Sequence, residues 1–583
     1  MKKDKLKKVV LCVCALIVLL LAIIFPKATW AYLVELVLAL AIMGVLLFDV
    51  DDKNNAAKVI LIVFIGFMIL SWIIPAAYYS GEYAEQGRTQ MGLFDMFNYP
   101  LTAVSYFGYI TLFLILVGGF YGVLHKIPAY RTFLDKIVRA FNGKEKLLLS
   151  IMVVVIAVLV SCCGLHIGIA VFVPFIVALI FMMGYDKITA ALVVVGSTAA
   201  GLIGTTCADA NLNVLTQTLS LKLDYNIWVR IVILVAAIAM VIFNVLVYVK
   251  RTMGNVKVIK KEVKKGAIEA KVEVKKTTKT SNSSKKKPAN KKASNSKKTN
   301  NKSNKKKNNN KAALKDGKVI VLTEAEEVDT VTEYVPSKSG SNHSVWPFTV
   351  LFILLFILVV LAFISWDAIG VKLFNNMTSS TTSFELFKFP IFAKILGTIN
   401  AFGAWSLTDL FVPLALIVVL LAVIYKVSFN EVLDGFVAGA KKALGPAVLS
   451  VLVYAILVLV TYHPFQLVVY NALLGMSKGF NILTTTIIAF LASLFNADIA
   501  YTFQSVLPYY ITKVTNLKDF SIVGIIFTSM YGLTALVAPT SLVLLASLSY
   551  LKISYKDWLK AVWKLALELF VVLLVVFIIL ALV

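Results

Sequence analysis

The chain has 583 residues and a mean hydropathy of +0.87, and its composition is 60% hydrophobic and only 15% charged. A soluble globular domain of this length is excluded, because its apolar surface would exceed what one core can bury. The sequence therefore predicts an all-α polytopic membrane protein. Its five cysteines show no metal-ligand spacing, so we expect no disulfide framework, no metal site and no bound cofactor.

The formal net charge of +26 comes mostly from one segment. Residues 250–318 contain 25 lysines and arginines against four acids, among many asparagines and serines. Such a composition cannot bury enough surface to fold, so residues 252–344 are predicted to be disordered. Lysine-rich loops stay cytoplasmic, and the N-terminal run KKDKLKK indicates the same side. We expect a multi-pass plasma-membrane protein whose N-terminus and basic insert are cytoplasmic.

Apolar runs of about 17–25 residues are long enough to cross a bilayer. In the first half they lie at residues 9–25, 29–48, 58–78, 102–124, 146–163, 167–183, 188–206 and 227–249. In the second half they lie at residues 345–366, 409–425, 446–462, 480–495, 520–550 (interrupted) and 558–582, and residues 388–405 are a further candidate. Residues 79–100 read as an outside polar stretch, and residues 207–226 as irregular polar structure.

Two amphipathic segments, 128–142 and 428–443, are typical of helices that lie in the membrane interface. Each half therefore shows the same predicted order of elements: a span, a loop, a span, an interfacial helix, a span, a break and further spans. Duplication with broken helices is the usual construction of secondary transporters, often as inverted repeats. Counting spans puts both interfacial helices on the cytoplasmic side, whereas an inverted repeat would put them on opposite sides, and both arrangements stay open. The predicted domains are an N-terminal helical hairpin, a first repeat, the insert and a second repeat, at residues 1–57, 58–251, 252–344 and 345–583.

The stretch Gly196–Asn213 places glycines, hydroxyls, amides and a carboxylate directly after an apolar run. Hydrocarbon cannot satisfy such groups, so the segment must be buried in protein or line a cavity. We predict a substrate site here, against the alternative of a glycine and alanine packing seam with its polar run in a loop. The candidate binding residues of this stretch are Gly204, Thr205, Thr206, Asp209, Asn211 and Asn213.

The second half has a counterpart in two pieces. FNADIAYTFQSVLP follows an apolar run, and TSMYGLTALVAPTSLVLLAS breaks another span at a proline, which frees a backbone carbonyl. The candidate binding residues here are Asn496, Asp498, Thr502, Gln504, Ser505, Gly532, Thr534, Thr540 and Ser541.

Four residues are candidates for coupling transport to an ion, either sodium or a proton. Asp209 and Asp498 are expected at membrane depth, where a carboxylate costs free energy and is usually kept for a function. The alternative is that both lie in loops already in contact with water. His166 and His463 end matching spans and titrate near neutrality, but packing or interfacial histidines are the alternative interpretation.

Three stretches resemble the anaerobic C4-dicarboxylate carrier family, also described as basic amino-acid antiporters, of the ion-transporter superfamily. They are FGYITLFLILVGGFYGVLHKIPAYRTFLDKIVRAFNGKEKLL, VPFIVALIFMMGYDKITAALVVVGSTAAGLIGTT, and DGFVAGAKKALGPAV with the later YGLTALVAPTSLVLLASLSYLKISYKDWLK. The resemblance implies two repeats with scaffold helices, re-entrant hairpins and broken helices, and a homodimer. It also implies a substrate held between hairpin tips and breaks, at 204–211, 496–505 and 532–541. Where the family has paired acids in the first hairpin, this chain has Gly164–Gly168.

The substrate class stays open between a C4-dicarboxylate and an amino acid or peptide-like metabolite. A dicarboxylate favours arginine, lysine or helix N-termini, and the predicted breaks contain no arginine or lysine. Asp209 and Asp498 would suit an amino group, which slightly favours the amino-acid alternative.

Other classes of function are less well supported. An enzyme is not expected, because the chain contains no GxSxG motif, no HExxH motif and no cysteine–histidine cluster. Two unequal halves argue against a channel. A membrane anchor is the second hypothesis, since residues 252–318 could bind nucleic acid, ribosomes or anionic lipid.

Overall fold

The computed structural model describes residues 29–48, 56–277, 344–397, 399–477 and 479–582. The predicted span 9–25 lies outside the described residues. Contacts divide the chain into two units, Met1–Val249 with Pro336–Val583, and Lys250–Val335.

The described part of the chain is almost entirely helical, as the hydropathy predicted. It contains eight helical segments long and apolar enough to cross a membrane. They are Ala56–Ile73 (α3), Asp95–Leu124 (α4), Glu145–Cys163 (α6), Ile227–Thr252 (within α11), Trp346–Phe363 (α12), Phe429–Tyr462 (α16), Leu517–Leu551 (α20 and α21) and Tyr555–Leu582 (α22). The protein is thus a polytopic α-helical membrane protein.

Shorter elements connect and flank these segments. In the first half they are α2 (Thr29–Phe48), α5 (Pro128–Ala140), η1 (Gly168–Val171), α7 (Val173–Met182), α8 (Lys187–Ala191), the π-helical η2 (Leu192–Gly196), α9 (Ser197–Ile203) and α10 (Asp209–Thr218). In the second half they are α13 (Leu373–Ser383), α14 (Ile391–Leu396), α15 (Phe411–Ile424), α17 (Gln466–Gly475), α18 (Ile482–Phe495), α19 (Ile499–Lys513), α20 (Leu517–Val537) and α21 (Leu542–Leu551).

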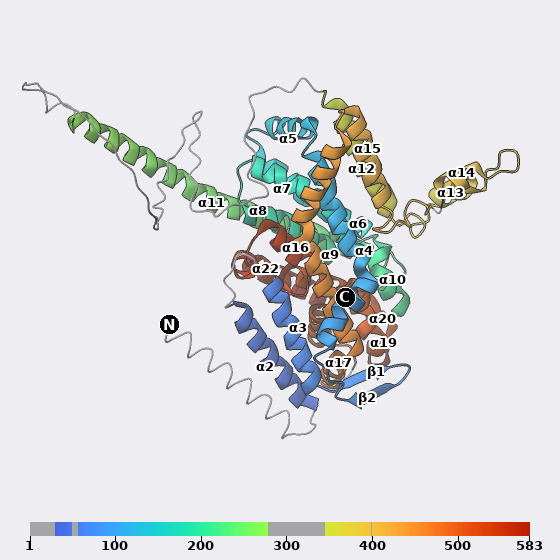
Figure 1. Cartoon of the computed structure of the whole chain (residues 1–583). Coiled ribbons are helices and arrows are strands. Elements are labelled where there is room, and N and C mark those ends of the chain that lie inside the picture. The colour runs from blue at the N-terminus through green and yellow to red at the C-terminus, as the bar shows by residue number, and fades with distance from the viewer. Residues whose placement is uncertain (1–28, 49–55, 278–343, 398, 478, 583) are drawn as a thin grey trace, which may run out of the picture. The chain divides into compact units, whose positions relative to one another are not determined.

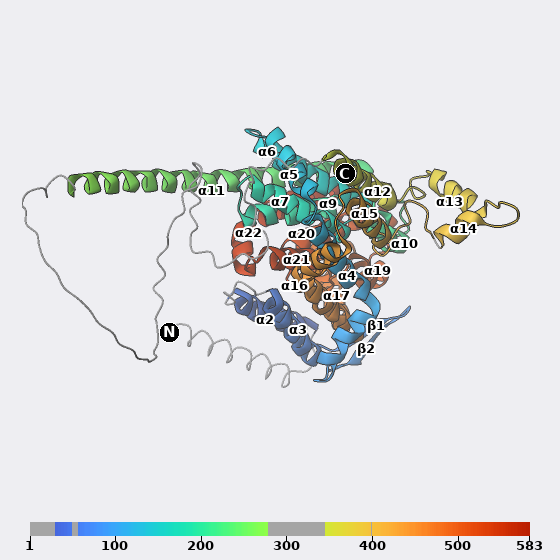
Figure 2. The ribbon, with the colours of Figure 1, turned by 45° about the horizontal axis from the view of Figure 1, so that its top comes forward.

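The order of elements recurs along the chain. The first series is α4, α5, α6, η1 with α7, α8 to α9, α10 and α11, and the second is α16, α17, α18, α19, α20, α21 and α22. The short helices α5 and α17 occupy the same place in the two series, yet α5 lies near the top of the bundle and α17 near the bottom in Figure 1, and α17 is again the lower of the two in Figure 2. An inverted repeat requires this arrangement of corresponding elements.

The two long helices α4 and α16 pack against each other along their lengths and form the centre of the fold (Figure 1). Glycines allow the close approach. A Cβ on Gly122 would lie 2.1 Å from the Gly435 carbonyl oxygen, and one on Gly439 would lie 2.1 Å from the Gly118 oxygen. Small residues that let backbones touch are the typical means of helix association in membranes.

Local sequence signals start many of the helices. Pro128 occupies the first turn of α5, and Ser428 with Glu431 forms a capping box at α16. The side chains of Asn481, Asn516 and Ser541 accept hydrogen bonds from the first-turn amides of α18, α20 and α21.

Several predicted boundaries are wrong. The span 58–78 ends at Ile73, because Pro75 stops the helix. Strand β1 (Ala76–Tyr79) replaces the end of that span and pairs antiparallel with β2 (Tyr83–Gly87) of the predicted polar stretch 79–100. The predicted interfacial segment 428–443 and span 446–462 form the single helix α16. Pro446 removes one backbone donor there, which does not end a helix packed along its length.

Two further differences concern polar segments. Residues 209–218 of the predicted irregular region form α10, where Thr216 and Thr218 bond back to the carbonyls of Leu212 and Val214. Residues 388–405 do not form a span. The one helix among the described residues of this range is the six-residue α14, which projects from the bundle with α13 (Figure 2). No residue of α13 or α14 is buried.

Helix α11 is longer than predicted, because it runs from Ile227 to Thr277. It therefore continues into the segment predicted to be disordered from residue 252 onward. Eight of the residues from 253 to 277 are lysine and three are glutamate, and both types are good helix formers. Residues 278–343 of the predicted insert lie outside the described residues.

Candidate functional site

Two helical hairpins and two interrupted helices supply the irregular backbone inside the bundle. Hairpin 1 (residues 145–182) turns at Gly164, whose φ of +67° favours glycine. Hairpin 2 (residues 482–513) turns at Asn496–Asp498. Break 1 (residues 204–208) separates α9 from α10, and break 2 (residues 538–541) separates α20 from α21.

Break 1 is held to the end of hairpin 1's first helix. The Ser161 hydroxyl donates to the Gly204 carbonyl oxygen at 2.7 Å, and the Thr206 amide donates to the Ser161 carbonyl oxygen at 3.0 Å. The two hydroxyls of Ser161 and Thr206 lie 3.0 Å apart. Carbonyls freed by the break are thereby partly satisfied from hairpin 1.

Arg230, in the first turns of α11, satisfies the other carbonyls of break 1. One guanidinium nitrogen donates to the oxygens of Thr205 and Thr206 at 3.3 and 3.0 Å, and the second donates to Leu223. The guanidinium also lies 4.2 Å from the ring centre of Tyr225, within cation–π range. The positive charge of Arg230 is therefore in direct contact with the carbonyl oxygens of break 1.

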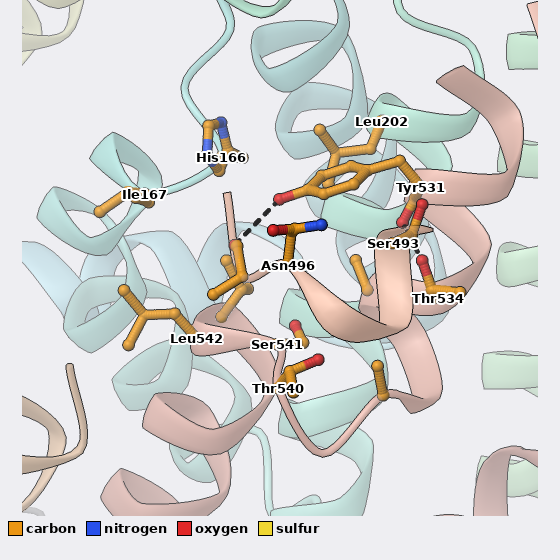
Figure 3. A pocket seen from close by; sticks show the side chains of 14 residues that line it. His166, Ile167, Leu202, Ser493, Asn496, Tyr531, Thr534, Thr540, Ser541 and Leu542 are labelled. Atoms are coloured by element: carbon orange, nitrogen blue, oxygen red, sulfur yellow. Dashed lines mark hydrogen bonds between the residues drawn. The ribbon is translucent and has the colours of Figure 1, made fainter. Parts of the chain in front are cut away.

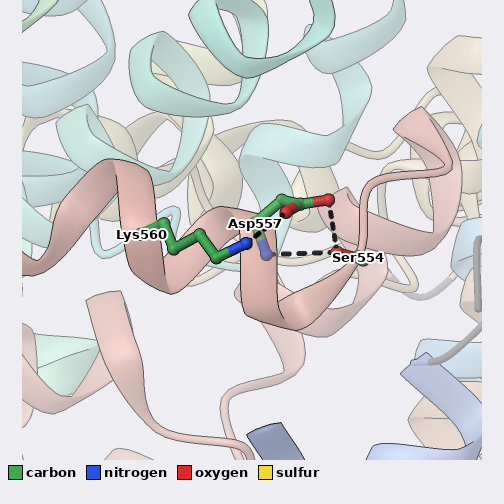
Figure 4. Close-up of polar contacts among 3 residues, drawn as sticks. All are labelled: Ser554, Asp557 and Lys560. Carbon is green, nitrogen blue, oxygen red and sulfur yellow. Dashed lines mark hydrogen bonds and ion pairs between the residues drawn. The ribbon is translucent and has the colours of Figure 1, made fainter. Parts of the chain in front are cut away.

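Break 2 is satisfied by α22 in a corresponding way. The Tyr555 hydroxyl donates to the Val537 oxygen at 2.6 Å, and the Trp558 indole N–H donates to the Leu536 oxygen at 3.0 Å. The start of α22 is fixed by Ser554 and Asp557, whose side chains bond at 2.7 Å, and Lys560 pairs with Asp557 at 3.3 Å (Figure 4). These contacts place Tyr555 and Trp558 beneath the end of α20.

A small central cavity of about 20 Å³ lies where the two hairpin tips and break 2 meet (Figure 3). His166 and Ile167 of hairpin 1 line it opposite Asn496 and Ala497 of hairpin 2. Its remaining lining residues are Leu202, Ser493, Tyr531, Thr534, Ala535, Ala538, Thr540, Ser541, Leu542 and Val543. No acidic side chain is among them.

Hydrogen bonds join hairpin 2 to break 2 at the central cavity. The Tyr531 hydroxyl donates to the Ala497 carbonyl oxygen at 3.2 Å, as the dashed line in Figure 3 shows. The Thr540 hydroxyl donates to the Leu494 oxygen at 2.8 Å. The Asn496 side-chain nitrogen is bonded to Ala492 and Ser505, which leaves its side-chain oxygen as an acceptor at the cavity.

The cavity also receives the N-terminus of α21. Ser541 caps this helix, and the next two residues, Leu542 and Val543, line the cavity. The first-turn amides of a helix have no partner within the helix, and its dipole is positive at this end. The end of α21 can therefore attract an anion or a carboxylate group.

The sequence comparison agrees with this geometry. The sequence model of the C4-dicarboxylate anaerobic carrier family matches residues 54–582. The chain belongs to this family. No curated protein matches the chain. The match covers both series of elements, so this member of the carrier family is a multi-pass membrane protein from a family of transporters.

The carrier brings some of its predicted site residues together and leaves others apart. His166 and four predicted binding residues line the central cavity: Asn496, Thr534, Thr540 and Ser541. The remaining predicted residues do not line it. They are Gly204, Thr205, Thr206, Asp209, Asn211, Asn213, Asp498, Thr502, Gln504, Ser505, Gly532 and His463.

Several of these outlying residues have structural roles. Gly204 and Gly532 permit close packing, since a Cβ there would lie 2.5 Å from the Leu234 Cα and 2.3 Å from the Ile203 amide nitrogen. The contact at Gly204 is the kind that the packing-seam alternative expected for its stretch. The hydroxyls of Thr205 and Thr502 bond to carbonyls of their own helices.

Polar residues of α10 and α19 vary in their surroundings. Asn211 is buried beside the turn of hairpin 1, and its side-chain nitrogen has no hydrogen-bond partner among the described residues. Asn213 accepts from the Val214 amide, Ser505 donates to the Thr502 oxygen, and Gln504 is exposed.

The two carboxylates differ in their surroundings. Asp498 caps α19 by accepting from the amides of Ala500 and Tyr501 at 2.9 and 3.2 Å, and it is close enough to His166 for electrostatic interaction. Asp209 opens α10 and is only partly buried. Asp498, but not Asp209, is thus near the central cavity.

His463 lies outside this site, at the end of α16. Its Nδ1 bonds the Thr89 carbonyl oxygen at 2.6 Å and its Nε2 bonds the Tyr99 hydroxyl at 2.6 Å. The structure therefore places it in a packing role near the β-hairpin, as the alternative interpretation held.

Sequence reasoning missed Tyr531 and Arg230. Tyr531 occurs in a predicted broken span, but an aromatic residue there also suits helix packing. Arg230 lies 22 residues beyond Ala208, in what reads as an ordinary apolar span. A charged residue inside that span was the signal that could have identified it.

Proposed function

We propose that the protein is a secondary active carrier for a C4-dicarboxylate or a closely related small dianion. The substrate would be held between the two hairpin tips and break 2, and its translocation would leave it chemically unchanged. The observation that carries this proposal is the central cavity, where irregular backbone from both repeats meets a helix N-terminus.

The chemistry of the lining supports a carboxylate ligand. In this closed arrangement the hydroxyls of Ser493, Thr540 and Tyr531 and the Asn496 side-chain nitrogen donate to protein oxygens, so the first-turn amides of α21 are the donors open to a carboxylate. Its lining contains no acidic side chain, and Arg230 adds a positive charge behind break 1. The N-terminus of α21 favours an anion over the ammonium group of an amino acid, while Asp498, near the cavity, caps α19 through its carboxylate. The amino-acid alternative rested on Asp209 and Asp498, and neither carboxylate lines the cavity.

The cavity is too small for the substrate as it stands. About 20 Å³ holds on the order of one water molecule, so a dicarboxylate requires the hairpin tips to separate. Hydrogen bonds such as Thr540 to Leu494 would then break and re-form during each cycle. We infer that the carrier alternates between this closed arrangement and more open ones.

Coupling to an ion is part of the proposal. Asp498 and His166 lie near the central cavity and are the candidates for proton coupling, while hairpin and break carbonyls could hold sodium. We further propose a plasma-membrane location with a cytoplasmic N-terminus, and a homodimer as the family resemblance implies.

The direct test measures the melting temperature of the purified protein with succinate, fumarate or malate, and with amino acids as comparison ligands. A ligand of the folded state raises the melting temperature by mass action. We expect the dicarboxylates to do so, and we expect Asn496→Ala to weaken binding about tenfold or more, because it removes a side-chain nitrogen that can donate to the charged carboxylate once the hairpin tips separate.

The matched control is Gln504→Ala, on the same hairpin but exposed. It should bind as the wild type does. Stabilisation by amino acids alone, or an Asn496→Ala variant that is folded and binds normally, would contradict the proposed substrate site. Uptake of labelled dicarboxylate into proteoliposomes, with and without sodium and a pH gradient, identifies the coupling ion.

A further inference from the structure

The burial of Arg230 is the starting point. Only 2% of its surface is exposed, although it lies within the membrane-spanning helix segment Ile227–Thr252. A buried charge in such a segment is costly and is retained where it serves a function. Among the residues that the structure describes, no carboxylate forms an ion pair with it.

The partners of this guanidinium are backbone carbonyls. It donates to the oxygens of Thr205 and Thr206 in break 1 and to the oxygen of Leu223, while its Nε has no partner among the described residues. Three carbonyl oxygens converging on one positive charge form an arrangement that otherwise suits a metal cation. Transporters built from broken helices hold their sodium at such unwound carbonyls.

At break 2, uncharged side chains satisfy the free backbone carbonyls, so hydrogen bonding to such carbonyls does not by itself require a charged residue. Trp558 is the fourth residue of α22, as Arg230 is the fourth of α11. Trp558 donates to Leu536 in the last turn of α20, whereas Arg230 donates to Thr205 and Thr206 just beyond the end of α9. A neutral indole with a neighbouring tyrosine hydroxyl satisfies break 2. The charge at break 1 therefore adds something beyond a helix cap.

We propose that the Arg230 guanidinium is a resident cation of break 1, occupying the carbonyl site that would otherwise bind a monovalent metal cation. Break 1 then takes no coupling ion, and any sodium that the carrier uses binds elsewhere. The fixed charge also contributes a favourable potential for the substrate carboxylate, and this clause alone rests on the proposed function. Arg230 acts through Thr205 and Thr206, so it is a positioning residue.

The test compares sodium dependence in wild type, Arg230→Gln and Arg230→Lys. Dicarboxylate binding is titrated at several sodium concentrations, with choline replacing sodium at constant ionic strength. We expect Arg230→Gln to bind about one more sodium ion per substrate than wild type does. A tenfold rise in sodium should then increase the substrate affinity of the variant by about tenfold beyond the increase seen in wild type. Arg230→Lys keeps the charge and should retain the wild-type dependence.

A second readout needs no substrate. The melting temperature of Arg230→Gln should rise with sodium, relative to choline, more steeply than that of wild type. It remains informative where dicarboxylates fail to bind, so failure of the proposed function and failure of this inference are separate results.

The matched control is Trp558→Phe, which removes a neutral donor at the corresponding position of break 2. It should lower stability without changing the sodium dependence. If Arg230→Gln keeps the wild-type sodium dependence, or Arg230→Lys acquires a new one, the guanidinium is a helix cap only and the inference is overturned. Where the glutamine variant does not fold, Arg230→Met provides the same decision, because it also removes the charge.

Discussion

Single hydroxyl groups at the two breaks mostly serve the backbone. Thr205 donates to the Leu202 oxygen at 2.8 Å, and Thr534 donates to the Met530 oxygen at 2.9 Å. Both residues were predicted as binding groups because hydroxyls at membrane depth need a partner. These hydroxyls do need a hydrogen-bond partner, but the sequence could not show that a nearby backbone carbonyl already provides one.

His463 gives a prediction at the scale of one residue. Burial lowers the pKa of His463 below its ordinary value near 6.5, while its bond to the Thr89 carbonyl and the charge of Asp95 act in the opposite direction. The unfolded chain therefore binds the proton more readily. The stability that the protein gains by keeping His463 neutral is fully present above about pH 6.5. It is lost as the pH falls below that value towards the lower pKa of the folded state.

The measurement is the melting temperature as a function of pH for wild type and His463→Asn. We expect the variant to be less stable near pH 8, because the Tyr99 and Thr89 bonds are lost, at a cost of about 1–3 kcal/mol. Its stability should also fall less between pH 7 and pH 5. Parallel pH curves for the two proteins would show that His463 does not titrate in this way.

At the scale of elements, the glycine-lined contact of α4 and α16 gives a sharp prediction. Gly122→Ala places a methyl group 2.1 Å from the Gly435 oxygen, where backbone atoms cannot move aside easily. Overpacking of this kind costs about 1–3 kcal/mol or more. We expect a lower melting temperature and less folded protein in size-exclusion profiles.

Gly108→Ala is the control on the same helix. A Cβ there meets only Val104 of its own helix, at the ordinary distance of 3.5 Å. Alanine is also a better helix former than glycine, so this variant should be as stable as wild type or more so. Equal destabilisation by both substitutions would argue against the close contact of α4 and α16.

Most elements could be predicted from hydropathy, because a run such as Glu145–Cys163 has few structural alternatives in a membrane. The errors fall where polar composition and packing compete. Residues 209–218 looked irregular because four of them are asparagine, aspartate or glutamine, yet they form α10, which packs against α19. Residues 466–475 were missed because a ten-residue apolar helix is too short to read as a span.

The candidate site was predicted only in part for a related reason. Helix breaks such as Pro539–Ser541 are visible in sequence, since proline and small polar residues interrupt an apolar run. Which breaks and tips meet is a matter of tertiary packing. The sequence therefore identified Asn496 and Thr540, but could not show that Thr206 faces Ser161 or that Arg230 reaches across to break 1.

At the scale of the whole molecule, the basic insert separates the two series of elements. Deleting residues 278–343 and joining the ends with a flexible linker removes 16 of the 57 lysines and arginines and lowers the formal net charge from +26 to +16. All residues of the proposed site remain, so we expect dicarboxylate binding and uptake to be retained. Binding and uptake are measured in proteoliposomes that differ in their content of anionic lipid.

Two results of this deletion would change the interpretation. Loss of uptake by a folded deletion variant would give the insert a role in transport. Loss of salt-sensitive binding to anionic vesicles, with uptake unchanged, would instead identify an accessory membrane contact, as lysine-rich segments commonly provide.

The contact of α4 and α16 also has a mechanical consequence. Where backbone touches backbone at Gly118, Gly122, Gly435 and Gly439, neither helix can slide or roll without driving a side chain into its neighbour. Interfaces packed this closely do not deform continuously. We therefore expect the pair to stay rigid while the rest of the carrier changes conformation. The movements of transport are expected in the surrounding hairpins and breaks, which single hydrogen bonds hold together.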